Sequence, residues 1–120
     1  MWRIFFRISA TLVVLHGVLT FGAAVAIFHV VSADSLAFAQ HGFTFIFIAA
    51  LNLVTWQAPR RPRWLGSAVH GCNVAFLAFN VLFAALKPEP PTITAAVLLG
   101  LLAISAVGMD VSVGNHSSSR

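Results

Sequence analysis

The chain has 120 residues, of which 59% are hydrophobic and 8% are charged, and its mean hydropathy is +0.93. Soluble domains contain about 25% charged residues, so this composition excludes a water-soluble domain and predicts a protein that has membrane lipid as its main solvent. The formal charge of +4 does not predict nucleic-acid binding, because the basic residues stand at the ends of apolar segments, where membrane topology explains them.

Four apolar segments follow one another along the chain, and each is long enough to cross a membrane as a helix, which takes about 20 residues. The first covers 8–31 and is longer than the apolar core of a signal peptide, which has about 7–15 residues. We expect the other three spans at 36–56, 64–86 and 92–109.

Short polar connections separate the four segments. Residues 32–35, Ser-Ala-Asp-Ser, predict a turn in which Ser35 is the N-cap of the second helix. Residues 57–63 contain two prolines and three arginines, which break a helix and resist transfer into hydrocarbon. The run Lys-Pro-Glu-Pro-Pro at 87–91 predicts a rigid break before the fourth helix.

These segments predict one domain over 1–110, an all-α, antiparallel four-helix transmembrane bundle, with a polar C-terminal tail over 111–120. The basic residues predict its orientation. With the N-terminus inside, six of the seven Lys and Arg residues lie on the inner side, and only Lys87 lies outside. The same inner boundary contains all three tryptophans, Trp2, Trp56 and Trp64. We therefore expect both termini in the cytoplasm, and this charge asymmetry favours a bacterial inner membrane.

Polar side chains occur at two depths within the predicted spans. If consecutive helices pack side by side, with turns near 33–34 and near 60, positions at equal distance from a turn lie level. The inner layer then consists of His16, Asn52, His70 and Asn73. The outer layer consists of His29, Gln40, His41 and Asn80. His41 and Asn52 are 11 positions apart, which is close to three turns, so they share one face of the second helix.

These polar layers have two interpretations. Asn, Gln and neutral His often form hydrogen bonds between membrane helices, worth about 0.6–2 kcal/mol each, and thereby fix the helix register. Alternatively, polar clusters inside a membrane mark a binding site or a solute path. Such a path would use His16, His41, Asn52 and His70.

A His-Gly dipeptide recurs at positions 16–17, 41–42 and 70–71. A glycine beside a histidine either clears room for a bulky group or lets two helices pack closely. Because histidine pairs on facing helices hold haem b in helical bundles, His16 with His70 and His29 with His41 are candidate haem ligands. We expect no other metal site, since no third strong ligand converges with these histidines.

The fourth segment has small residues at a spacing that is typical of close helix contact, namely Ala96, Gly100 and Ala103, and again a small residue at Gly108. The partner of this surface is either the first helix or another subunit.

Several functional classes are excluded by what the sequence lacks. Cys72 is the only cysteine, which excludes an intrachain disulfide and CxxC redox chemistry. All three carboxylates stand at the ends of segments, so proton antiport through an intramembrane carboxylate is not expected. No phosphate-binding loop or hydrolase motif is present. We therefore expect a non-enzymatic protein that binds other membrane subunits or copies of itself, with a small transporter or channel and a haem-b electron carrier as the alternatives.

Overall fold

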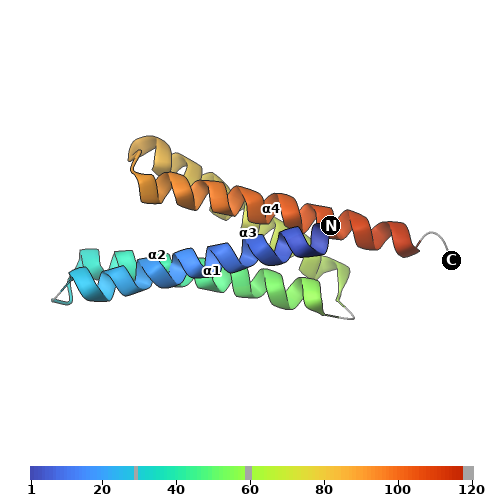
Figure 1. The fold of residues 1–120 in the computed structure, drawn as a ribbon, viewed down its shortest axis with the longest axis horizontal. Coiled ribbons are helices and arrows are strands. Elements are labelled where there is room, and N and C mark those ends of the chain that lie inside the picture. The colour runs from blue at the N-terminus through green and yellow to red at the C-terminus, as the bar shows by residue number, and fades with distance from the viewer. Residues whose placement is uncertain (29, 59–60, 118–120) are drawn as a thin grey trace.

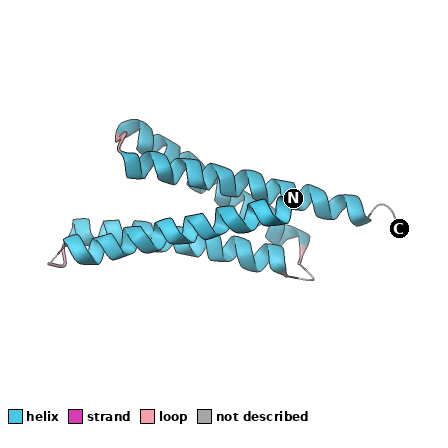
Figure 2. Ribbon diagram, viewed as in Figure 1, coloured by secondary structure: helices cyan, strands magenta, loops and turns pink. Residues whose placement is uncertain are grey.

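The computed structural model describes residues 1–28, 30–58 and 61–117, with side chains as far as position 111. Its secondary structure consists of four helices (Figure 1), namely α1 (Trp2–Ile27), α2 (Ala33–Gln57), α3 (Arg63–Leu86) and α4 (Pro90–Ser117). Figure 2 shows that only short loops connect them. All four are long and apolar enough to cross a membrane. The prediction of an all-α protein with four long apolar helices is confirmed.

The first turn begins earlier in the chain than its predicted position. α1 ends at Ile27, and Ser32 is the N-cap of α2, so the assignment of Ser35 as the cap is wrong. Ser35 is instead the second half of a capping box. The Ser35 amide donates to the Ser32 hydroxyl at 3.1 Å, and the Ser32 amide donates to the Ser35 hydroxyl at 2.8 Å. This reciprocal pair satisfies two amides that the helix itself leaves without acceptors.

The last helix ends later than its predicted span. α4 continues to Ser117, beyond the expected end at Met109 and into the segment 111–120 that we expected as a polar tail. The difference arises because loss of apolar character ends a membrane span but does not by itself end a helix. No proline occurs in this segment to interrupt the helix.

The four helices form two pairs. In Figure 1, α1 and α2 lie side by side as one hairpin, and α3 and α4 form a second hairpin that crosses the first. The tips of the two hairpins lie apart in this view. α1 packs against both α2 and α4, whereas α2 and α3 have far fewer contacts. α1 therefore joins the two halves of the molecule.

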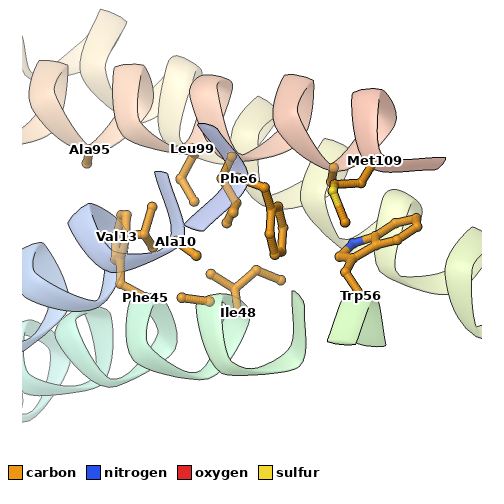
Figure 3. Close-up of a cluster of buried hydrophobic side chains, with 12 residues drawn as sticks. Phe6, Ala10, Val13, Phe45, Ile48, Trp56, Ala95, Leu99 and Met109 are labelled. Carbon is orange, nitrogen blue, oxygen red and sulfur yellow. The ribbon is translucent and has the colours of Figure 1, made fainter. Parts of the chain in front are cut away.

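The hydrophobic core lies between α1, α2 and α4 (Figure 3). Its buried members are Phe6, Ala10 and Val13 of α1, Phe45, Ile48, Ala49 and Trp56 of α2, and Ala95, Leu99, Leu102, Ala106 and Met109 of α4. Alanines lie among larger residues on the buried faces of α1 and α4, which lets the two helices interdigitate. α3 adds only the partly buried Phe76 and Leu77, so it is the most peripheral helix of the four.

α1 and α2 make backbone contact at Gly17 and Gly42. A Cβ atom on Gly17 would lie 2.7 Å from the carbonyl oxygen of Gly42, and one on Gly42 would lie 2.6 Å from the amide nitrogen of Phe21. Two of the three His-Gly dipeptides thus serve close helix packing. Gly71, in the third, has open space where its Cβ would be.

Candidate functional site

A pair of asparagines links α2 to α3 in the interior. Asn52 Nδ2 donates to Asn73 Oδ1 at 2.7 Å, and Asn73 Nδ2 donates back to Asn52 Oδ1 at 2.9 Å. Asn52 Nδ2 also donates to the Ile48 carbonyl of its own helix at 2.8 Å. Both side chains are buried. The structure therefore brings together two of the four residues of the predicted inner layer, and these two satisfy each other.

His16 packs against α2 nearer the start of that helix than its predicted layer. Its ring packs against Phe45, with 5.0 Å between ring centroids, and His41 packs against the same Phe45 at 4.9 Å. His16 and His41 were predicted in different layers but share one neighbour. The reason is the Gly17–Gly42 contact, because the midpoint between these positions falls between positions 29 and 30. The prediction placed the turn later, near 33–34, and therefore paired each residue of α1 with a residue too far along α2.

The predicted outer layer does not assemble into one cluster. Asn80 is buried, but its Nδ2 donates to the Phe76 carbonyl of its own helix at 2.9 Å. His41 reaches across to α3, where its ring lies 6.3 Å from that of Phe83. Gln40 is exposed on the surface of α2. His29 lies outside the described residues, so its place in the layer stays a prediction.

His70 belongs to a polar cluster near the start of α3 that differs from both predicted layers. Arg61 donates through Nη2 to Asp110 Oδ1 at 2.5 Å, and His70 Nε2 lies 3.6 Å from Asp110 Oδ2. The Arg61 guanidinium also stacks over Trp56, with 3.6 Å between Cζ and the ring centroid. The His70 ring lies 5.2 Å from that of Trp56. This cluster ties the α2–α3 loop to α3 and α4.

The sequence contained a signal for this cluster. Asp110 follows the fourth apolar segment, at the same predicted boundary as the arginines of residues 57–63. Opposite charges at one membrane boundary attract each other, so an ion pair between the two segments is the expected arrangement. Arg61 and Asp110 lie outside the predicted spans and therefore outside both predicted polar layers.

His16 and His70 do not fit a haem held between two axial imidazoles, because they have different neighbours, Phe45 for the first and Trp56 with Asp110 for the second. The other predicted pair, His29 with His41, stays a prediction, because His29 lies outside the described residues. The described part of the chain also contains no group of three or more His, Cys, Asp or Glu residues arranged to hold a metal ion.

The predicted packing residues of α4 lie at the edge of its buried face. Ala96, Gly100 and Ala103 are half-buried, and a Cβ on Gly100 would make an ordinary 3.9 Å contact with Leu77 of α3. Gly108 is the more tightly packed of these two glycines of α4, because an added Cβ there would overlap the indole of Trp2 of α1. The sequence pattern thus pointed to the correct helix, and its last small residue, Gly108, packs against the first helix.

An apolar hollow of about 410 Å³ lies on the surface beside this contact. It is lined by Trp2, Ala103, Ile104, Val107, Gly108 and Val111. These residues present almost only carbon, which suits a lipid acyl chain and gives no polar group for substrate recognition.

Taken together, the composition and the four long apolar helices define a small membrane protein. No family model matches the chain, and no curated protein or solved structure matches it either.

Proposed function

We propose that this protein is a non-enzymatic integral membrane protein that works by helix association, as an accessory subunit of a membrane complex or as a homo-oligomer. The observation that carries the proposal is the Asn52–Asn73 pair. Each amide uses the other as donor and acceptor, so the most polar point of the interior is occupied by protein groups. Buried amides that satisfy each other fix helix register and leave no free group for a ligand.

The outer surface supports the same proposal. α3 is covered by the other helices far less than α4 is. Its uncovered face is apolar and includes Val74, Phe79 and Leu82. In a membrane this face contacts either lipid or the helices of another subunit.

The proposed arrangement in the membrane follows from charge. The bundle is antiparallel and spans a bacterial inner membrane four times, with both termini cytoplasmic. Arg3, Arg7 and Arg61 then lie on the cytoplasmic side, and Lys87 lies outside, as the distribution of basic residues favours. Reporter fusions at each terminus and at position 88 test this orientation, which is wrong if the terminal reporters are active outside the cell.

The association itself is tested by purification from membranes in a mild detergent, followed by native mass spectrometry. We expect a dimer, a higher oligomer, or a complex with another membrane subunit. A monomer that carries only lipid, at several detergent concentrations and after chemical crosslinking in intact membranes, would contradict the proposal.

A second candidate function is a small transporter or channel, and one observation favours it. His16 and His41 flank Phe45, and within the described residues neither imidazole takes part in a hydrogen bond. Unpaired imidazoles inside a membrane are typical of proton or cation paths. Flux assays in proteoliposomes, with His16→Ala and His41→Ala as variants, test this function. The candidate fails if the wild-type protein moves no protons or monovalent cations.

A further inference from the structure

The carboxamide of Gln40 lies on the outer surface of α2, and within the described residues it has no hydrogen-bond partner. Only the backbone carbonyl of Gln40 is used, as acceptor for the Thr44 hydroxyl at 2.8 Å. The three asparagines of the spans differ, because all are buried and hydrogen-bonded. Gln40 is thus the exception among the intramembrane amides.

The depth of Gln40 makes its exposure significant. It lies 16 residues before Trp56, which is about 24 Å along the helix axis at 1.5 Å per residue. The hydrocarbon of a bilayer is about 30 Å thick, so with Trp56 at the inner boundary Gln40 lies inside the outer part of the hydrocarbon. A primary amide has two donors and an acceptor that lipid tails cannot satisfy.

Gln40 is also part of a continuous exposed stripe on α2. The stripe consists of Leu36, Gln40, Phe43, Phe47, Ala50 and Val54. Its members alternate at spacings of four and three residues, which is the seam of two helices packed as a left-handed coiled coil. A single polar residue in such a seam fixes the register and the number of helices.

We propose that a second copy of this chain docks on this stripe, with the two α2 helices packed in parallel and the two Gln40 carboxamides hydrogen-bonded to each other. The partner is a copy of the chain because an amide is complementary to itself, as donor and as acceptor. Two copies inserted in the same orientation are related by a two-fold axis along the membrane normal, which places equal residues at equal depth. This inference rests on the proposed function and names its partner.

The test is disulfide crosslinking in native membranes. In a Cys72→Ala background, Ala50→Cys places a single thiol on the stripe, and Ala75→Cys places one on the exposed face of α3 as the matched control. We expect oxidation to crosslink the first variant into a dimer and to leave the second monomeric. The wild-type chain is a further control, because its exposed Cys72 on α3 should not crosslink.

The role of Gln40 is tested by Gln40→Leu, with Gln57→Leu as its control. Gln57 continues the same stripe but lies at the inner boundary beside Trp56, where water can pair with its amide. We expect Gln40→Leu to weaken dimerisation about three- to thirty-fold, from the strength of hydrogen bonds between membrane helices, and Gln57→Leu to leave it unchanged. Förster transfer between labelled copies in vesicles measures the dimer fraction. Circular dichroism checks that both variants keep their helices.

The possible outcomes separate this inference from the proposed function. Crosslinks through Cys72 or Ala75→Cys, but not through Ala50→Cys, would overturn the α2 interface and leave association intact. A different protein crosslinked to Ala50→Cys would overturn the choice of a second copy. An unchanged dimer in Gln40→Leu would overturn the pairing of the carboxamides. A monomer without any partner would overturn both proposals.

Discussion

The side chains of Asn52 and Asn73 exchange two hydrogen bonds across the interface between α2 and α3, at 2.7 and 2.9 Å. The pair is a polar link between two helices that otherwise have few contacts with each other. Since both amides are buried, neither has water as an alternative partner. The pair therefore fixes the position of α3 against the first hairpin.

We predict that Asn52→Leu or Asn73→Leu alone destabilises the fold by about 1–3 kcal/mol, because each leaves one buried amide without its partner. The double variant should lose less than the sum of the two single losses, since it removes both polar groups together. Reversible unfolding in mixed detergent micelles measures these differences.

Asn80→Leu is the matched control for this pair. Asn80 is buried as well, but among the described residues it donates only to Phe76 of its own helix. The losses of unfolding free energy caused by Asn80→Leu and Asn73→Leu should simply add in the double variant. Strict additivity of Asn52→Leu with Asn73→Leu would contradict the interpretation of the pair as a mutual hydrogen bond.

Hydrophobicity and helix breakers were sufficient to predict the four helices. Each apolar run fell within the range of about 17–25 residues that a membrane span takes, and the proline-rich connections at 57–63 and 87–91 left little choice of boundary. The connection between α1 and α2 was harder to place. Val30 and Val31 are apolar and were counted in the first span, yet they belong to the loop because α1 ends at Ile27.

The site was predictable only where the register was right. The turn near 60 was nearly correct, so Asn52 and Asn73 were placed in one layer, and the structure brings them together. Between α1 and α2 the register depends on the contact of Gly17 with Gly42, and composition alone gives no measure of how closely two backbones approach. His16 was consequently paired with the wrong depth of α2.

We predict that Gly42→Ala destabilises the α1–α2 hairpin by about 1–3 kcal/mol, as overpacking does. The added methyl group would lie 2.6–2.7 Å from backbone atoms of α1, so the two helices have to separate. Gly22→Ala is the control, because nothing lies within 4 Å of its Cβ position. It should be neutral or slightly stabilising through better helix propensity. Thermal unfolding in detergent compares the two, and an equal effect would contradict the close contact.

The cluster around Arg61 predicts a difference between two neighbouring arginines. Arg61→Ala removes both the ion pair with Asp110 and the stacking on Trp56, and we expect a loss of about 0.5–2 kcal/mol. Arg63→Ala should change stability by less, since Arg63 is exposed. Arg61→Lys should recover only part of the loss, because an ammonium group does not stack as a planar guanidinium does.

Salt dependence separates the two contributions of Arg61. Asp110→Asn removes the ion pair and keeps the stacking on Trp56. Its effect should therefore shrink as ionic strength rises, because Asp110 is half-exposed and salt screens its charge. Stability measured at low and at about 1 M salt tests this expectation. A loss in Asp110→Asn that is independent of salt would show that the contact acts through packing instead.

The contact between Trp2 and Gly108 gives a prediction about how α1 closes against α4. An added Cβ on Gly108 would overlap the indole ring, so Gly108→Ala has to displace Trp2. We expect a loss of about 1–3 kcal/mol in the wild-type background and a smaller loss in a Trp2→Ala background, where the obstacle is absent. Tryptophan emission in a Trp56→Phe, Trp64→Phe background reports the displacement directly, because Trp2 is then the only emitter. If Gly108→Ala changes neither the emission nor the stability, the start of α1 does not pack on Gly108, and the apolar hollow beside it lacks the wall that Trp2 provides.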